Sequence, residues 1–336
     1  MAGPVGIREV AERAGVSIGT VSNVLNKPEI VATRTRELVQ SVIEELGFVR
    51  NDLARQLKMG RGKTLGMIVL SVANPFFADL AHACEAAAEE AGYTVVLGSS
   101  DHLQAREERY MDLFEEQRVS GMLITPTNGA TQRMKSKHNR GMRMVLFDAL
   151  ADESEFCSVA LDGLEGGKLA VSHLVETGRK RIAFVAGASY LIEDRWEGAN
   201  WVCDRNPGVS LERLDTVDQS VAAGHATGLA IAERPPEERP DAIFAGTDQL
   251  AIGLMQALVL TKDIDVPRDI AIIGYDDIDY AASAIIPLTT IRQPTDAIAR
   301  EAIRLIEADS QDVPHDHERI RLMPELIVRA STPNVG

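Results

Sequence analysis

The chain contains 336 residues, of which 45% are hydrophobic and 25% charged, a composition that fits a globular protein of two or three domains. The sequence lacks an apolar run of about eighteen residues, which excludes a transmembrane helix, and residues 1–13 lack the apolar segment of a signal peptide, so we expect a cytoplasmic protein. The formal net charge of -15, taken alone, disfavours a nucleic-acid partner.

This charge is unevenly distributed along the chain. Residues 1–63 hold ten Lys or Arg and seven Asp or Glu, a net charge of +3, whereas residues 64–336 carry a net charge of -18. A basic N-terminal segment can lie against phosphates that would repel the acidic remainder. The distribution therefore leaves open a nucleic-acid partner for the N-terminal segment alone.

The first sixty residues carry the pattern of three short helices. Four apolar residues fall on one face of the first helix: Ile7, Val10, Ala11 and Ala14. Gly15 ends this helix, and Ser17 can cap a second helix that ends at 26–28. A third helix is predicted over 33–46, and its apolar stripe comprises Leu38, Val39, Val42, Ile43 and Leu46.

After Lys63, buried strands alternate with helices. Strands are predicted over 65–70, 93–97, 122–124 and 143–147, and helices over 76–91 and 104–117. A second series begins near 158–161 and continues with a helix over 165–177, strands over 181–185, 242–245 and 270–273, and a helix over 249–260. This alternation predicts an α/β fold of two lobes, each with a doubly wound parallel sheet. The strand carboxyl ends of two such lobes face a cleft, which is a natural site for a small ligand.

Residues 7–26 have the spacing of a helix-turn-helix. Ala11 is small where the two helices cross, and Gly15 supplies the turn. The exposed start of the second helix would enter the major groove of DNA, and it carries Ile18, Gly19, Thr20, Ser22 and Asn23. On spacing alone, a helical hairpin within a larger helical domain is an alternative interpretation.

The run IREVAERAGVSIGTVSNVLN at 7–26 resembles the LacI/GalR family of transcription regulators, and the resemblance spans nearly the whole chain. Further matching segments are NPFFADL at 74–80, GRKRIAFVAG at 178–187, AGTDQLAIG at 245–253, IIGYDDI at 272–278 and PLTTIRQP at 287–294. The resemblance implies a helix-turn-helix domain at 1–50, a hinge helix and linker at 51–63, and a core of two periplasmic-binding-protein-like lobes at 64–336. The lobe limits expected from it are 64–160 with 292–320, and 161–291 with 321–336.

The resemblance also implies a set of DNA contacts in the head: Ser17, Ile18, Gly19, Thr20, Ser22, Asn23 and Asn26. The hydroxyl residues Ser17, Thr20 and Ser22 anchor and frame the recognition helix on DNA. Ile18 and Gly19 occupy the two positions that mainly read the bases in this family. Asn23 stands where the family often has Arg, and Asn favours adenine where Arg favours guanine. Because Gly19 has no side chain, we expect an operator that departs from the family's commonest one.

Segment 51–59, NDLARQLKM, matches the family's hinge helix. Nine residues are too few for a stable isolated helix, so a flexible linker also describes the unbound state. The resemblance implies that the segment folds on DNA, paired in the minor groove with the same segment of a second copy. Leu57 matches the apolar wedge that opens the central base step, and Arg55 and Lys58 can reach phosphates or groove edges.

The resemblance places an effector site between the lobes. Its candidate residues are Asn74, Phe76, Phe77, Asp148, Arg195, Thr247, Asp276 and Gln293. Carboxylates and a guanidinium can satisfy several sugar hydroxyls at fixed angles, and aromatic rings can stack on the sugar ring. The alternative role for Asp276 is to cap the following turn, and the same alternative stays open for Asp148. The alternative for Arg195 is a surface salt bridge.

Three positions depart from the family's usual sugar set. Thr247 stands where many members have Asn, and Ala149 and Gly163 replace polar or basic residues. Because these changes remove hydrogen-bond donors, a smaller sugar, a modified sugar or a nucleobase remains an open alternative.

The sequence carries no recognisable catalytic, metal or cofactor motif. The three cysteines, Cys84, Cys157 and Cys203, lack metal or redox spacing and fit structural thiols. Segment 163–168 resembles a phosphate loop but fails its spacing, and His315 and His317 fit a solvated tail better than a metal site.

The leading interpretation is therefore a repressor, not an enzyme. It predicts a homodimer that binds a near-palindromic operator in double-stranded DNA and responds to a small effector, expected to be a carbohydrate, with no membrane partner. A soluble sugar-binding protein and a nucleotide-binding α/β enzyme are the alternatives from other classes. The helix-turn-helix opposes the first, and the absence of a phosphate-loop or dinucleotide fingerprint opposes the second.

Overall fold

The computed structural model describes residues 5–48, 62–149, 155–309 and 316–333. The chain divides between Gly62 and Lys63 into two compact units, which we call the head and the core unit. Over the described ranges, no helix is both long enough and apolar enough to cross a membrane.

The head consists of α1 (Ile7–Ala14), α2 (Ile18–Asn26), the 3-10 turn η1 (Pro28–Ile30) and α3 (Thr33–Leu46). Gly15 ends α1 with a φ of 65°, in the left-handed region that favours glycine. Leu38 was expected in the apolar stripe of α3 but is 48% exposed. It precedes the buried Val39 and therefore points about 100° away around the helix. The small hydrophobic core of the head comprises Val10, Ala11, Ala14, Val21, Val24, Val39 and Val42.

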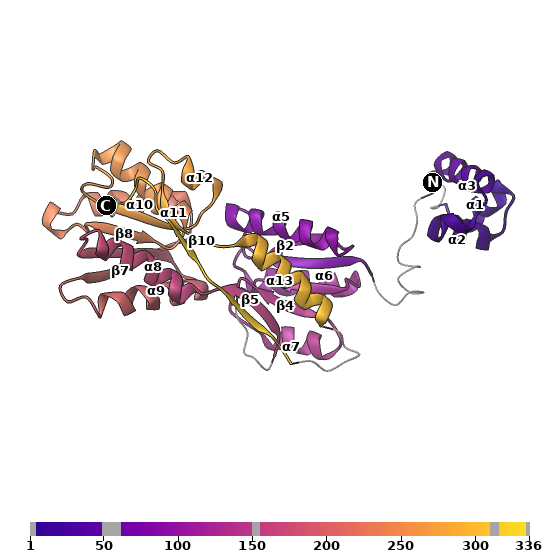
Figure 1. Cartoon of the computed structure of the whole chain (residues 1–336), viewed down its shortest axis with the longest axis horizontal. Coiled ribbons are helices and arrows are strands. Elements are labelled where there is room, and N and C mark those ends of the chain that lie inside the picture. The colour runs from indigo at the N-terminus through magenta and orange to yellow at the C-terminus, as the bar shows by residue number, and fades with distance from the viewer. Residues whose placement is uncertain (1–4, 49–61, 150–154, 310–315, 334–336) are drawn as a thin grey trace. The chain divides into compact units, whose positions relative to one another are not determined.

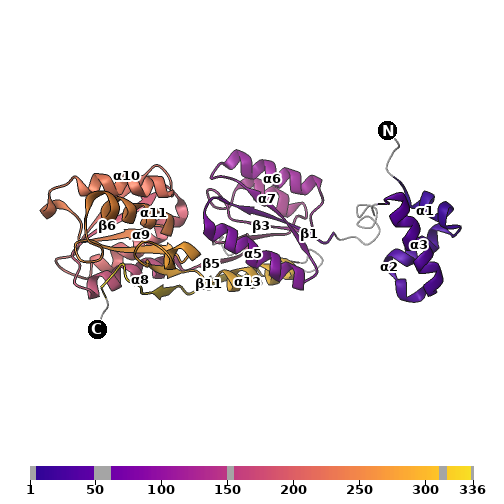
Figure 2. The same ribbon diagram turned by 90° about the horizontal axis from the view of Figure 1, so that it is seen from above.

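Lobe one of the core unit is built on a six-stranded parallel sheet with the order β11-β5-β4-β3-β1-β2. Its strands are β1 (Thr64–Val69), β2 (Thr94–Ser99), β3 (Gly121–Ile124), β4 (Met144–Phe147), β5 (Cys157–Leu161) and β11 (Arg319–Leu322). The helices are α5 (Pro75–Glu90), α6 (Gln104–Glu116), α7 (Gln132–Asn139) and α13 (Thr295–Ala308). Helices α6 and α7 cover one face of the sheet, and α5 and α13 cover the other (Figures 1 and 2).

Lobe two repeats this plan with the order β12-β10-β9-β8-β6-β7, in which only β12 runs antiparallel to its neighbour. Its strands are β6 (Arg181–Gly187), β7 (Ser210–Thr216), β8 (Ala242–Ala245), β9 (Ala271–Asp276), β10 (Thr289–Arg292) and β12 (Glu325–Ile327). Its main helices are α8 (Gly163–Glu176), α9 (Tyr190–Cys203), α10 (Val221–Ala232) and α11 (Asp248–Met255). Shorter turns are η2 (Pro236–Glu238), the π-helical η3 (Gln256–Thr261) and α12 (Asp279–Ala282). The predicted fold, a helical head followed by two doubly wound lobes, is confirmed.

The strand β5 corrects one prediction about the lobes. It pairs with β4 and β11, so it is an inner strand of the sheet of lobe one and does not open the second series. The lobe limits were expected at about 160 and 320, and the strands β5 and β11 of this sheet end at Leu161 and Leu322. The chain enters lobe two before α8, returns after β10 to form α13, and leaves lobe one again between β11 and β12.

The elements between β6 and β8 were not predicted. Strand β7 lies at a sheet edge and carries charged residues, so it lacks the run of apolar residues that marks a buried strand. Helix α10 packs against α11 through small residues, and a Cβ atom at Gly224 would come within 2.2 Å of the Leu250 carbonyl oxygen. Such close packing leaves no stripe of large apolar residues for a sequence pattern to detect.

Candidate functional site

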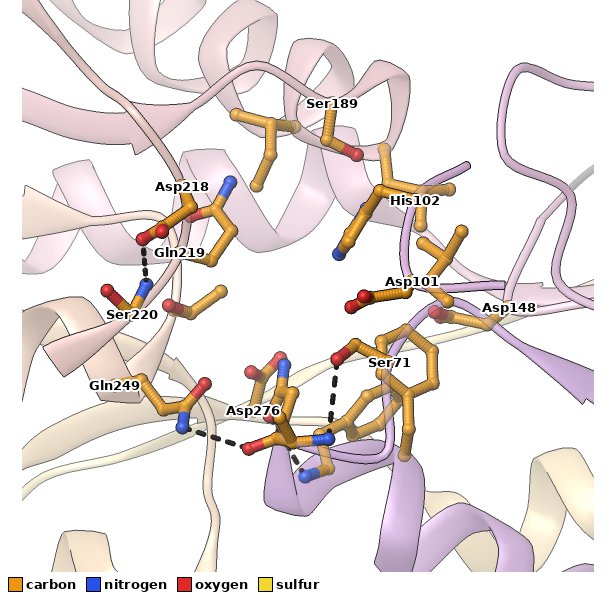
Figure 3. A pocket seen from close by; sticks show the side chains of 18 of the residues that line it. Ser71, Asp101, His102, Asp148, Ser189, Asp218, Gln219, Ser220, Gln249 and Asp276 are labelled. Carbon is orange, nitrogen blue, oxygen red and sulfur yellow. Dashed lines mark hydrogen bonds between the residues drawn. The ribbon is translucent and has the colours of Figure 1, made fainter. Parts of the chain in front are cut away.

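The core unit contains a cavity of about 260 Å³, which we call the cleft, lined by loops from both lobes. Lobe one contributes polar side chains that follow β1, β2 and β4: Ser71, Asn74, Asp101, His102 and Asp148. Lobe two contributes those that follow β6, β7, β8 and β9 or lie on neighbouring helices: Ser189, Arg195, Asp218, Gln219, Ser220, Thr247, Gln249 and Asp276. Figure 3 shows the labelled side chains around the open centre of this cleft. Their common origin is the carboxyl ends of parallel strands, where α/β folds place ligands.

Asp148, Arg195 and Asp276 form the charged centre of the cleft. Each is less than a tenth exposed, so Arg195 is not a surface salt-bridge residue. Burial raises the pKa of Asp148 to about 7 and that of Asp276 to about 6, although the Arg195 guanidinium opposes both shifts. The Arg195 guanidinium thus favours the ionised form of both buried carboxylates.

Both aspartates also have unusual backbone conformations. The φ angle is 52° at Asp148 and 118° at Asp276, in a region that residues with a Cβ atom rarely adopt. Such strain persists only where the surrounding structure enforces it, and it concentrates at functional sites. The strain aims a carboxylate from each lobe at the cleft.

Arg195 is fixed by two contacts within lobe two. Its guanidinium donates a hydrogen bond to the carbonyl oxygen of Gly246. The guanidinium carbon also lies 3.6 Å from the centre of the Tyr275 ring. This stacked cation-π geometry holds the planar group in one orientation, ready for a directional hydrogen bond.

The other predicted contacts take different positions. Asn74 caps α5 by accepting a 3.1 Å hydrogen bond from the Phe76 backbone, and its side chain also bonds to Asp276. The Phe76 and Phe77 rings pack edge to face, with their centres 5.1 Å apart, and both line the cleft. Thr247 caps the start of α11 and also lines the cleft. Gln293 does not line the cleft. It lies behind Asp276 and donates a 2.8 Å hydrogen bond to its Oδ1 atom.

Several lining residues were not identified from the sequence. Asp101 and His102 follow β2, and the rule that ligand groups follow the carboxyl ends of parallel strands could have indicated them. Burial lowers the pKa of His102, while Asp101 and Asp218 oppose that shift. Residues 218–220 follow the unpredicted β7, so no signal was available for them. Gln249 donates a 3.2 Å hydrogen bond to the Ala73 carbonyl oxygen and so joins lobe two to lobe one.

In the head, α2 presents the predicted DNA contacts on its solvent side. Ser17 accepts a 3.0 Å hydrogen bond from the Thr20 backbone and contacts the Thr20 hydroxyl at 2.9 Å, which fixes the start of the helix. Ile18 is 45% exposed although it is a large apolar residue. The remaining members are exposed or half-buried: Gly19, Ser22, Asn23 and Asn26. Val21 and Val24 anchor the opposite side of α2 in the hydrophobic core of the head.

The hinge residues Arg55, Leu57 and Lys58 lie outside the described residues. Their roles remain those that the sequence resemblance implies.

A helix-turn-helix head joined to a two-lobed core with a polar cleft defines the class of ligand-responsive DNA-binding regulators. Residues 6–51 match the model of the lacI family of bacterial regulatory proteins, and residues 171–332 match that of periplasmic binding protein-like domains. The chain belongs to the LacI family and is a transcription regulator.

Full-length relatives agree with this assignment. The chain is 31% identical to the HTH-type transcriptional repressor PurR of Photobacterium profundum, over 98% of this chain and 99% of that protein. It is also 31% identical to the ribose operon repressor of Escherichia coli, over 97% and 99% of the two chains. Among solved structures, a Lac repressor dimer bound to operator and the anti-inducer ONPF superposes with a TM-score of 0.82 at 27% identity, covering 98% and 99% of the two chains.

Proposed function

We propose that the chain is a dimeric repressor whose affinity for a near-palindromic operator changes when an uncharged sugar binds in the cleft. The observation that carries the ligand proposal is the buried group of Asp148, Arg195 and Asp276, which places a carboxylate from each lobe and one guanidinium on the lining of the same cleft.

The hydrogen-bonding groups of the cleft suit a polyhydroxylated ligand. A carboxylate accepts hydrogen bonds from two neighbouring hydroxyls, and a guanidinium donates to a third oxygen at a fixed angle. Phe76 and Phe77 add an apolar surface for the face of a sugar ring. At about 260 Å³ the cleft lies just below the usual range of about 300–1,000 Å³ for ligand pockets, which favours a small ligand.

The charge of the cleft disfavours anionic ligands. Four aspartates line it, Asp101, Asp148, Asp218 and Asp276, against the single guanidinium of Arg195. A phosphate would bring its own negative charge into this field, where the low dielectric of a buried site strengthens the repulsion. We therefore favour a neutral sugar over a sugar phosphate.

The switch follows from the position of the ligand between the lobes. A sugar that bonds to Asp148 of lobe one and to Arg195 of lobe two stabilises one relative arrangement of the lobes over others. A coupling free energy of about 1–3 kcal/mol changes operator occupancy from several-fold to more than a hundredfold. The cross-lobe hydrogen bond from Gln249 to Ala73 is one contact that such a change would remodel.

Operator recognition is assigned to the exposed side of α2. Asn23 offers an amide that pairs with adenine, while Gly19 contributes no side chain to base reading. Two heads in a symmetric dimer would read two half-sites, which accounts for a near-palindromic operator. Phosphate contacts would make this affinity fall steeply with salt.

Thermal denaturation of the full chain tests the ligand class. The panel contains neutral monosaccharides, their phosphate esters and purine bases, because a ligand that binds only the folded state raises its melting temperature. We expect a neutral sugar to raise it, and to change the affinity for operators selected from random DNA. Arg195→Ala should abolish this response, whereas Arg205→Ala, beyond the end of the same helix and outside the cleft, should retain it. Stabilisation by purines or phosphate esters alone would refute the sugar proposal.

A further inference from the structure

A second cavity of about 230 Å³ lies beside the cleft, where the chain crosses between the lobes. We call it the second chamber. It shares Asp148, Leu191 and Arg195 with the lining of the cleft, so the two cavities are neighbours across these three side chains.

Small residues create the space of the second chamber. Ala149, Ala160 and Gly163 all line it, and a larger side chain at any of them would reduce its volume. The first obstacle to a Cβ atom at Gly163 is the Cβ atom of Asp194, at 3.0 Å. The sequence resemblance implies that Ala149 and Gly163 replace larger polar or basic residues, so the space depends on these small side chains.

Three buried polar atoms around the second chamber have no hydrogen-bond partner among the described residues: Tyr275 Oη, Gln293 Oε1 and Arg195 Nε. All three side chains are more than nine-tenths buried. Because the amide nitrogen of Gln293 donates to Asp276, its oxygen is directed away from that carboxylate. Tyr275 and Gln293 line the second chamber but not the cleft. Folded proteins pair nearly all buried polar atoms, so these three indicate a polar occupant.

The three atoms specify the chemistry of that occupant. Arg195 Nε needs an acceptor, Gln293 Oε1 needs a donor, and the Tyr275 hydroxyl can serve as either. A hydroxyl group both donates and accepts, so neighbouring hydroxyls satisfy the whole set. The charged lining is balanced, with Asp148 and Asp194 against Arg195 and Arg319, which favours an uncharged group.

We propose that the second chamber is a subsite for a hydroxylated substituent of the effector, which extends past Arg195 and is larger than a single monosaccharide. This inference rests on the proposed function, in which the effector is an uncharged sugar bound in the cleft. It extends that proposal by giving the size of the effector and by naming Arg195, Tyr275 and Gln293 as residues that select for its substituent.

Calorimetric titration of the full chain tests the subsite. The probes are the neutral monosaccharides that raise the melting temperature, and disaccharides that carry the same sugar at one end. We expect at least one disaccharide to bind about tenfold more tightly than its monosaccharide. Tyr275→Phe should lower the affinity for that disaccharide by about three- to tenfold, which corresponds to the loss of one hydrogen bond. The affinity for the monosaccharide should stay within about twofold of the native value. Tyr110→Phe, a half-buried tyrosine outside both cavities, should change neither.

Gly163→Ala provides a second test should Tyr275→Phe fail to fold, because it adds a methyl group at a residue that lines the second chamber, and its first contact is the Cβ atom of Asp194 at 3.0 Å. It should lower disaccharide affinity and spare the monosaccharide. If monosaccharides bind but no disaccharide binds better, the chamber holds only water and the inference is overturned while the proposed function stands. Equal weakening of both sugars by Tyr275→Phe also overturns it. If no neutral sugar binds the native chain, the proposed function and the inference fail together.

Discussion

Gln293 donates a hydrogen bond of 2.8 Å to Asp276, and this bond ties the segment after β10 to the carboxylate at the end of β9. Gln293 lies where the chain crosses from lobe two to lobe one, and it is 4% exposed. The bond also favours the ionised form of Asp276, because it lowers the pKa of a carboxyl that burial raises. The side-chain amide of Gln293 thus couples the segment that crosses between the lobes to the Asp276 carboxylate in the cleft.

We predict that Gln293→Leu weakens effector binding by about three- to tenfold, through the loss of this hydrogen bond. The same loss should raise the pKa of Asp276 further, so the pH at which binding is half-maximal moves upward. Calorimetric titrations between pH 5.5 and 8 measure both effects. Gln104→Leu, on the exposed surface of α6, is the matched control. Unchanged affinity with an unchanged pH profile would show that the amide does not support Asp276.

The raised pKa values of the two cleft aspartates predict a pH dependence of stability. Burial raises the pKa of Asp148 from 3.8 to about 7 and that of Asp276 from 3.8 to about 6. Between about pH 4 and pH 7 the folded state therefore binds more protons than the unfolded state. The stabilising contribution of these protons is complete below about pH 4 and is lost as the pH rises through 7.

Chemical denaturation of the ligand-free chain at pH 5 and pH 8 measures this contribution. The free energy of unfolding should fall over the interval, and Asp148→Asn should make the fall smaller, because an amide has no proton to lose. An identical pH dependence in the native chain and the variant would contradict the burial of a titrating Asp148. Effector affinity should change in the opposite sense and rise toward pH 8, since ionised carboxylates accept hydrogen bonds from sugar hydroxyls more strongly.

Arg195→Lys separates the charge of this residue from its shape. The ammonium still neutralises Asp148 and Asp276, so we expect a folded protein that loses no more than about 1–2 kcal/mol of stability. It cannot reproduce the planar fork that is stacked on Tyr275, so effector affinity should fall by about tenfold or more. Arg195→Ala removes the guanidinium and its stacking on Tyr275 altogether and should cost more stability than Arg195→Lys. Equal stability and affinity for all three proteins would refute the charged centre of the cleft.

The sequence predicted the elements that have a strong local signal. Gly15 and Ser17 mark the turn of the head, and both adopt the expected conformations because a left-handed glycine and a hydroxyl cap act within a few residues. The buried strands of both lobes were recognisable as apolar runs. Seven of the eight predicted effector residues line one cleft.

The remaining features depend on tertiary packing. Gln293 looked like a ligand contact, but its place behind Asp276 follows from how β10 pairs with β9. Residues 218–220 line the cleft but were not predicted from the sequence, because they follow β7, an edge strand without an apolar run. The second chamber exists because small residues line it. An alanine or glycine in a sequence does not reveal whether a neighbouring side chain fills the space that it leaves.

The identity of residue 23 predicts a change in operator preference. Asn23 is exposed on α2, in the C-terminal half of the helix, and an amide pairs with adenine in the major groove. Asn23→Arg should shift the preferred base at one position of each half-site from adenine to guanine. Discrimination should change by about 1–3 kcal/mol per half-site, while stability stays unchanged because the side chain is exposed.

Selection of bound sequences from random DNA measures this shift in the native chain and the variant. Asn139→Arg, in lobe one and outside the head, controls for the added positive charge. If Asn23 reads a base, only Asn23→Arg changes the selected sequence. If the residue contacts phosphate alone, the variant binds all sequences more tightly, with a steeper dependence on salt and the same preferred bases, because an added phosphate contact releases counterions without reading sequence.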